Sequence, residues 1–248
     1  MYGKELPDAI RVRALCGLCK MGSHGGNTSN LKTFAEGAVI NLAKKLRPFI
    51  VGEDKPLDCK KWAAEGLAFL TLDADVKEMI VSDKKICKTV RMLCSDGDPT
   101  VQFGLANMLV NITNSYDIEE KSEEKEALKK IGKYAGEHIP EPHQLDAEEY
   151  AKSRVDRLVR KHKMVEAIVE LGATESERAR EQVARVLFAF SSEREHRGAV
   201  LAAGGAKLLV KLYSKNTEKG KKKAAHALAK LAISQDPHMA FPGERAAE

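Results

Sequence analysis

The chain has 248 residues, five cysteines and a net charge of +5 at pH 7, with 31% charged and only 5% aromatic residues. The scarcity of aromatic residues, and the lack of alternating apolar and polar runs between turn signals, argue against a β-sheet protein. No apolar run approaches the roughly 18 residues of a membrane span, and no secretory signal opens the chain. An odd number of cysteines in helical patterns indicates free thiols, so we expect a cytoplasmic protein without membrane contact.

One apolar spacing recurs along the chain and predicts a series of similar helices. Each copy has alanine or valine, then leucine three residues later, then a further apolar residue after another three. The copies in chain order are Val12/Leu15/Leu18, Ala64/Leu67/Leu70, Ala106/Leu109/Ile112, Ala184/Leu187/Phe190 and Ala225/Leu228/Leu231. Residues at this spacing lie on one face of a helix, so each triplet predicts one buried stripe.

The distances between copies indicate the fold. Ala64 and Ala106 are 42 residues apart, and Ala184 and Ala225 are 41 apart, close to the period of armadillo and HEAT repeats. Helices this short cannot bury an apolar stripe alone, so neighbouring copies must stack on one another. We therefore predict an all-α protein, an armadillo-repeat superhelical solenoid.

Turn signals separate the predicted helices in chain order. Pro48 is expected to end or bend a helical stretch over residues 31–51. Asp73 and Asp75 resemble part of a calcium loop, but the glycine and distal glutamate are missing, so helix capping is favoured. The pair Gly204-Gly205 predicts the end of one helix, because glycine accepts the left-handed conformation found at helix ends.

A long insertion interrupts the repeats over residues 117–163. Residues 117–150 carry 11 acidic and 5 basic side chains. The prolines in HIPEPHQ, residues 138–144, exclude a helix around them, whereas the flanking segments look helical. We interpret the middle of this insertion as a junction between two stacks of helices.

The residues that most resemble catalytic or metal-binding groups are better explained by packing. Cys16 and Cys19 lack a second metal-binding pair, and we expect them, like Cys87 and Cys94, to be packed thiols. His138 and His143 share a loop with no third ligand at a useful spacing. His226 fits either a polar core position or a groove.

No set of nucleophile, base and orienting residue stands out. We therefore predict no catalytic residue, metal or cofactor, and a protein that is not an enzyme.

A basic cluster begins the last predicted helix. It consists of Lys219, Lys221, Lys222 and Lys223, and residues 207–230 hold eight lysines against one glutamate. Such a surface attracts acidic partners. Nucleic acid is not expected, because no aromatic residues are interleaved with the lysines. A solvated helix start is the simpler interpretation, although lysines are unfavourable at a helix N-terminus, which favours a partner.

The position just before the last core residue of each repeat indicates what the concave face binds. Armadillo proteins that bind extended peptides carry asparagine there, whereas this chain has Phe69, Asn111, Ala189 and Lys230. Only Asn111 fits, so a repeated clamp on a peptide backbone is disfavoured. Phe69, Asn111 and Lys230, with the lysine cluster, are the predicted protein-binding residues.

Several long sequence segments resemble those of the UCS family of myosin chaperones, in its animal UNC type. They include GLCKMGSHGG at 17–26, WAAEGLAFLTLDADVK at 62–77, HIPEPH at 138–143 and RGAVLAAGGAKLL at 197–209. The resemblance covers nearly the whole chain in the same order. It implies an armadillo solenoid that helps to fold myosin motor domains and to assemble filaments, as part of muscle development.

The resemblance also implies a domain organisation and a set of partners. Residues 1–137 would end the central region, and residues 138–248 would form the neck and the first repeats of the UCS domain, incomplete at the C-terminus. The partners implied are the myosin heavy chain motor domain and heat-shock chaperones, the latter through a tetratricopeptide region absent from this chain. The alternative is an armadillo adaptor that binds an acidic protein through the lysine cluster.

Overall fold

The computed structural model describes residues 6–23, 37–115 and 143–234, and every regular element within these ranges is helical. The α-helices are α1 (Asp8–Ser23), α2 (Ala38–Val51), α3 (Leu57–Leu70), α4 (Ala74–Ser82), α5 (Lys84–Ser95), α6 (Pro99–Ile112), α8 (Glu148–Asp156), α9 (Met164–Leu171), α10 (Glu177–Phe190), α11 (Arg194–Ala202), α12 (Gly205–Ser214) and α13 (Glu218–Ser234). A 3₁₀ turn, η2 (Gln144–Asp146), precedes α8, and a π-helical segment, η3 (Arg157–Lys161), follows it.

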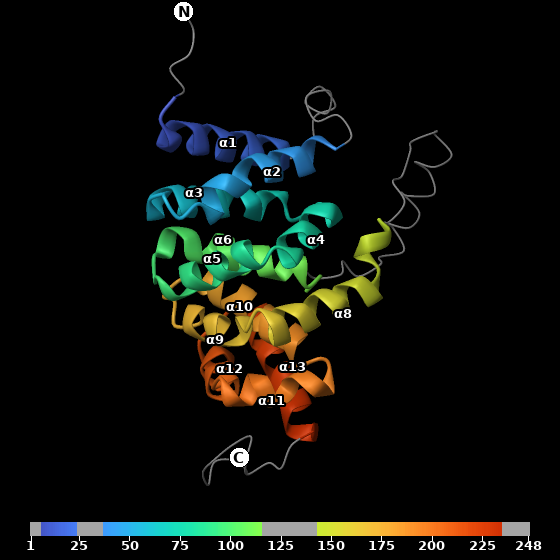
Figure 1. Ribbon diagram of the computed structural model, residues 1–248. Helices are drawn as coiled ribbons and strands as arrows, with labels where there is room; N and C mark the ends of the chain where they lie inside the picture. Colours follow the sequence, from blue (N-terminus) through green and yellow to red (C-terminus); the bar gives the residue numbers. More distant parts are fainter. Residues whose placement is uncertain (1–5, 24–36, 116–142, 235–248) are drawn as a thin grey trace, which may run out of the picture.

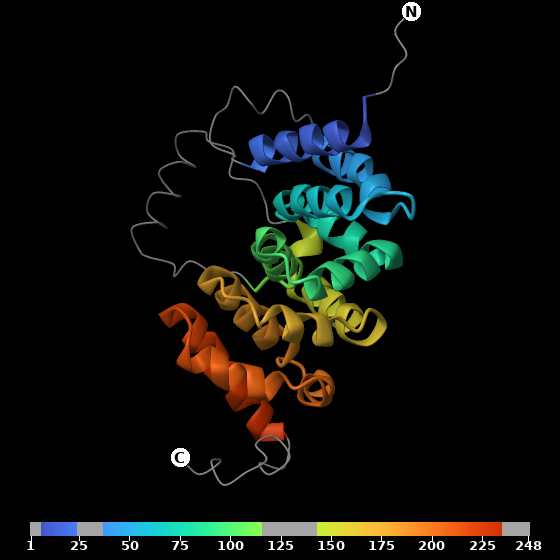
Figure 2. The ribbon, with the colours of Figure 1, turned by 90° about the vertical axis from the view of Figure 1, so that its left-hand side faces the viewer.

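The helices stack in sequence order from α1 at one end to α13 at the other (Figure 1). One layer contains α1, α3, α6, α10 and α13, each in contact with the next, and these are the helices that carry the recurring triplet. A second layer contains α2, α5, α9 and α12, and the short helices α4, α8 and α11 complete the later repeats. Figure 2 shows the same order of layers from a second side. The predicted all-α armadillo solenoid is confirmed.

Short polar side chains fix where several helices begin. Asp73 accepts a hydrogen bond from the backbone N–H of Val76 at the start of α4, which confirms its predicted capping role. Asp98 caps α6 in the same way, with Pro99 as the first helical residue, where its missing N–H costs nothing. These caps satisfy backbone donors that have no partner inside the helix.

The triplet is buried as predicted in the three middle helices of its layer. Its nine residues in α3, α6 and α10 are each at most 3% exposed, namely Ala64, Leu67, Leu70, Ala106, Leu109, Ile112, Ala184, Leu187 and Phe190. Small alanines allow the neighbouring helix to approach, and the larger residues fill the space between layers. The repeat spacing therefore identified the core of the stack.

At both ends of the stack only part of the predicted face is buried. In α1, Val12 is buried, but Leu18 is 40% exposed, and Cys16 and Cys19 face the core. The reason is that α1 packs on α2 and α3 through one face only, and no described helix covers the other.

In α13 the predicted residue Leu231 is buried, together with Ala224 and Ala227, whereas Ala225 and Leu228 are only partly buried. Within its layer, α13 packs against α10, and no described helix of that layer lies on its other side.

Two glycines and one proline near helix ends behave differently from one another. Gly204 has φ +81° between α11 and α12, as its predicted turn requires. Gly172 ends α9 in a right-handed conformation, and it is needed because an added Cβ would collide with the side chain of Leu208 on α12. Pro48 does not end its helix, since α2 runs on to Val51.

The stack continues past the insertion, because α6 contacts α10 and α5 contacts α9. Residues 116–142, which include most of the acidic run and His138, lie outside the described residues. The helical prediction for the segment that follows the prolines is confirmed by α8, η3 and α9.

Candidate binding groove

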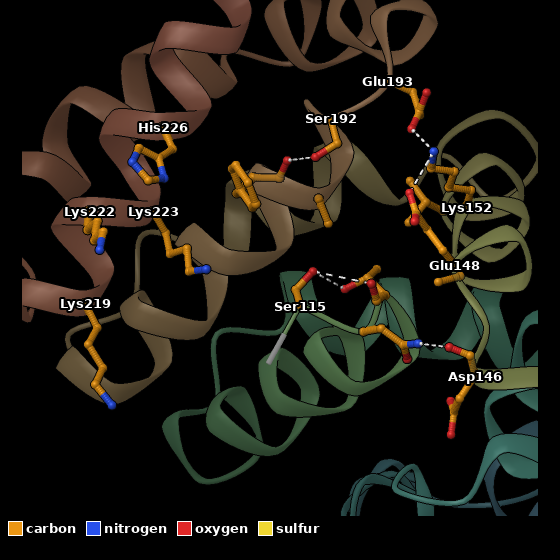
Figure 3. A pocket seen from close by; sticks show the side chains of 16 residues that line it. Ser115, Asp146, Glu148, Lys152, Ser192, Glu193, Lys219, Lys222, Lys223 and His226 are labelled. Atoms are coloured by element: carbon orange, nitrogen blue, oxygen red, sulfur yellow. Dashed lines mark hydrogen bonds and ion pairs between the residues drawn. The ribbon is translucent and has the colours of Figure 1, made fainter. Parts of the chain in front are cut away.

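A cavity of about 1040 Å³ lies between α8, α10, α13 and the end of α6. Helix α13 supplies one wall, α8 and Glu193 supply the opposite wall, and the end of α10 forms the floor (Figure 3). Because its walls come from helices of successive repeats, stacking of the repeats creates this groove.

The wall from α13 is basic. Lys219, Lys222, Lys223 and His226 all line the groove, and their spacing of three, four and seven residues from the first places them on one face of the helix. Lys219, Lys222 and His226 are exposed, whereas Lys223 is half-buried. This face therefore presents several positive charges to the same space.

The floor is apolar and centres on Phe188. The ammonium groups of Lys223 and Lys230 lie 5.3 and 5.2 Å from the centroid of its ring. The imidazole of His226 lies 6.1 Å from the same centroid, tilted by 50°. Cations at this distance are attracted to the ring, so Phe188 helps to position the lysines around the floor.

The opposite wall is acidic, but its carboxylates already bind lysines. The ammonium of Lys152 lies 2.9 Å from Glu148 and 3.5 Å from Glu193. Asp146 lies 2.6 Å from the ammonium of Lys77. The two walls of the groove thus carry charges of opposite sign. The negative charges of the acidic wall are already paired with Lys152 and Lys77, which do not belong to α13.

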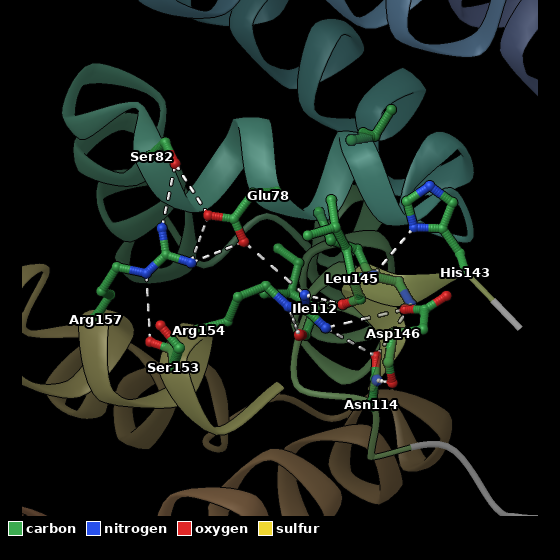
Figure 4. Close-up of polar contacts among 12 residues, drawn as sticks. Glu78, Ser82, Ile112, Asn114, His143, Leu145, Asp146, Ser153, Arg154 and Arg157 are labelled. Atoms are coloured by element: carbon green, nitrogen blue, oxygen red, sulfur yellow. Dashed lines mark hydrogen bonds and ion pairs between the residues drawn. The ribbon is translucent and has the colours of Figure 1, made fainter. Parts of the chain in front are cut away.

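A buried polar cluster holds the acidic wall in place (Figure 4). Arg154 is fully buried and donates from Nε to the carbonyl of Ile112 at 2.8 Å, and from Nη1 to the carbonyl of Leu145 at 2.7 Å. Lys77, only 2% exposed, donates to the side chain of Asn114 at 3.0 Å. Burial lowers the pKa of Lys77, and its bond to Asp146 opposes that shift.

Comparisons with known proteins show what the chain is similar to. Along its whole length it is 39% identical to protein unc-45 homolog B of Xenopus laevis, and it covers 27% of that protein. The chain is homologous to UNC-45. Its fold matches UNC-45 from Drosophila melanogaster with a TM-score of 0.81 and 37% identity, over 98% of this chain and 30% of that one.

A further structure, UNC-45 from C. elegans, matches with a TM-score of 0.79 and 35% identity, over 97% of this chain and 24% of that one. That protein is described as a myosin chaperone in complex with an Hsp90 peptide. No family model matches the chain. The chain spans about a quarter of the length of the UNC-45 relatives.

Within this UNC-45 homologue, the predicted lysine cluster divides. Lys219, Lys222 and Lys223 line the groove, and Lys230 lies beside them on Phe188. Lys221 is not in the lining. Its ammonium lies 2.8 Å from Glu218, and this bond raises the pKa of Lys221.

The other two predicted residues lie elsewhere along the stack. Asn111 is 5% exposed and donates from its amide to the hydroxyl of Thr71 at 3.0 Å, so it bridges two repeats. Phe69 is half-buried on α3, with the ammonium of Lys20 5.6 Å from its ring centroid. The structure therefore does not gather Phe69, Asn111 and the lysines at one site.

Sequence reasoning missed Phe188 and the acidic wall. Phe188 lies one residue before Ala189, so the same repeat register that selected Lys230 could have indicated it. The wall residues had no such signal, because Asp146 and Glu148 lie within the insertion and Glu193 belongs to no recurring position. His226, for which two interpretations were open, is an exposed groove residue.

The cysteines are packed thiols, as predicted. All five are buried, and burial raises the pKa of Cys16 to about 11 and those of Cys19 and Cys94 to about 12. A buried thiol with a raised pKa is a poor nucleophile.

Among the described residues, no group of three or more His, Cys, Asp or Glu side chains is arranged to hold a metal ion. None of the helices in the described ranges is long and apolar enough to cross a membrane.

Proposed function

We propose that this chain is a protein-binding segment of a myosin-directed co-chaperone that assists folding and assembly of myosin motor domains. The observation that supports this most is homology along the whole chain to UNC-45, whose C. elegans member is described as a myosin chaperone in complex with an Hsp90 peptide. Heat-shock chaperones would bind through a tetratricopeptide region that is not part of these 248 residues.

The proposed division of the chain follows the same homology. Residues 1–137 would correspond to the end of the central region, and residues 138–248 to the neck and the first repeats of the UCS domain. Helices α6 and α10 come from the two sides of this boundary and pack on each other. A client could therefore contact both parts on one continuous surface.

The mode of action is binding and not catalysis. The cavity that the described helices form is an open groove, and the buried thiols with raised pKa values are unsuited to nucleophilic attack. Free thiols also suit a cytoplasmic protein. We propose that Phe69 and Lys230, on the layer of helices that carries the triplet, are among the residues that contact the client.

The test is suppression of heat-induced aggregation of a myosin motor fragment, followed by light scattering. We expect the wild-type chain to reduce scattering weakly, and to leave an unrelated heat-labile enzyme unprotected. Phe69→Ser combined with Lys230→Glu should remove the protection. Lys44→Glu, at an exposed position on α2 of the other layer, should keep it. If the wild-type chain neither reduces scattering nor retains myosin in a pull-down, this function is wrong.

A second function is supported by the groove. We propose that the chain acts as an adaptor for an acidic protein partner, contacted by Lys219, Lys222 and Lys223 and, at the edge, by Lys221. The support is the gathering of three of these lysines on one wall of a cavity. This function is compatible with the first, because the groove occupies only the α8–α13 end of the stack.

A further inference from the structure

We propose that the groove binds a short acidic peptide segment of another protein, with its carboxylates on Lys219 and Lys222 and one apolar side chain against the floor. This inference rests on the second function above, and it specifies the ligand. The basic wall, the apolar floor and the acidic wall each limit what the groove can accept.

The basic wall sets the charge of the ligand. Lys219, Lys222 and Lys223 lie within four residues on one helix face, so their ammonium groups reach the same side of the cavity. The carboxylates across the groove are held by Lys77 and Lys152, which come from outside α13. A ligand that supplies several carboxylates along one side would complement this wall.

The floor sets the second requirement. Phe188 and Ala189 of the floor, with Ala151 and Val155 of the α8 wall beside it, give an apolar surface inside an otherwise charged cavity. Binding sites commonly combine such a surface with a few polar groups that orient the ligand. A single apolar side chain, inserted between flanking acidic residues, would bury area here while its neighbours reach the lysines.

The acidic wall excludes other polyanions. A nucleic acid strand is charged at every residue, and its phosphates would face Glu148 and Glu193 across the groove. A peptide differs in this respect, because it can place acidic residues toward α13 and neutral or basic residues toward α8.

The experiment measures binding of a fluorescein-labelled peptide, one phenylalanine flanked by glutamates, to the 248-residue chain by anisotropy at low salt. Lys219→Glu with Lys222→Glu should raise the Kd about tenfold or more, since two attractions become repulsions. Lys207→Glu with Lys211→Glu makes the same change in net charge on exposed α12 positions outside the groove lining, and should change the Kd less than about twofold.

Two altered peptides test the floor and the sign of charge. Alanine in place of phenylalanine should weaken binding about threefold or more, because the buried apolar area is lost. Lysines in place of glutamates should abolish binding. Equal affinity for the phenylalanine and alanine peptides would overturn the role of the floor.

The outcomes also separate this inference from the function on which it rests. If the two double substitutions weaken binding equally, the attraction is spread over the surface. The groove is then not the binding site, although the chain still binds an acidic partner. If the wild-type chain binds no acidic peptide, both the groove and the second function are wrong, and the myosin assay is unaffected.

The remaining occupant to test is the acidic run of the chain itself. A variant with glutamine in place of Glu119, Glu120, Glu123, Glu124 and Glu126 should bind the peptide as the wild type does. If this variant binds the peptide and the wild type does not, the chain's own acidic segment occupies the groove. The proposal that the groove binds a segment of another protein is then wrong.

Discussion

One contact between helices of successive repeats is apolar, and another is polar. Where α3 meets α6, the contact is closed by apolar side chains, with Leu67 and Leu109 each at most 1% exposed. Its bridging polar pair is Asn111 with Thr71. Where α8, in the last part of the insertion, joins the stack, the contact with α4 and the end of α6 is closed by Arg154 and Lys77.

The difference shows how each contact obtains its specificity. An apolar contact repeated at a fixed period accepts any neighbour with a matching stripe, so the repeat spacing decides the pairing. The polar contact is particular to one arrangement, because the donors of Arg154 meet the carbonyl of Ile112, before the insertion, and that of Leu145, within it. We expect it to fix where the chain re-enters the stack, as buried charges fix register in other systems.

The largest expected effect comes from breaking the polar contact. Arg154→Met keeps most of the side-chain volume. It leaves the carbonyls of Ile112 and Leu145 without this donor, and the carboxylates of Glu78 and Asp146 without one of their cations. We expect the free energy of unfolding in urea to fall by about 3–5 kcal/mol, the usual cost of removing one member of a buried charged group.

Arg160→Met is the matched control. Arg160 binds Asp156 at 2.8 Å, but its side chain is 57% exposed, so the loss should be about 0–1 kcal/mol. Equal losses for the two variants would show that the buried cluster contributes no more than a surface pair.

The apolar contacts could be predicted from the sequence, and the polar one could not. The triplets of α3, α6 and α10 identified the core because each places three apolar residues on one helix face. Those of α3 and α6 are 42 residues apart, and that of α10 recurs after the insertion. Asp73 was likewise identified as a cap from its place before a helix. Arg154 gave no signal, since its partners at Ile112 and Leu145 are brought together only by the fold.

Similar limits explain the errors at the site and at the ends. Lys221, Lys222 and Lys223 are consecutive, so at about 100° per residue they cannot all face one groove. In α1, the apolar residues outnumber what one face can bury, and the choice of Val12 with Cys16 and Cys19 depends on contact with α2 and α3. Local sequence does not contain that information.

A smaller effect tests how closely the apolar contact between α9 and α12 is packed. Gly172→Ala places a methyl group against the side chain of Leu208, which has to move. We expect a loss of about 1–3 kcal/mol in unfolding free energy. Adding Leu208→Ala makes room, so the double variant should lose less than the sum of the two single changes, by about 1 kcal/mol.

Gly104→Ala is the control for this substitution. An added Cβ there would lie 3.9 Å from the Cβ of Ala68, an ordinary contact. Alanine in a helix interior should stabilise the chain by about 0.5–1 kcal/mol. If Gly172→Ala is also stabilising, the contact between α9 and α12 is looser than the structure indicates.

The smallest expected effect lies beside the polar contact and depends on pH. His162, 9% exposed, has its Nε2 2.9 Å from the carbonyl of Val81. Burial lowers the pKa of His162, and the nearby cations Arg157, Lys161 and Lys84 act in the same direction. The folded chain therefore favours neutral imidazole, whereas the unfolded chain takes up a proton near the ordinary pKa of about 6.5.

The sign of the pH dependence follows from this difference. The contribution of His162 to stability is complete above the ordinary histidine pKa, and it is lost as the pH falls from there through the lowered pKa of the folded state. His162→Gln keeps an amide donor for Val81 but removes the titration. Unfolding free energies measured between pH 8 and pH 5.5 should therefore fall less steeply in the variant, and parallel profiles would show that the protonation of His162 is not coupled to folding.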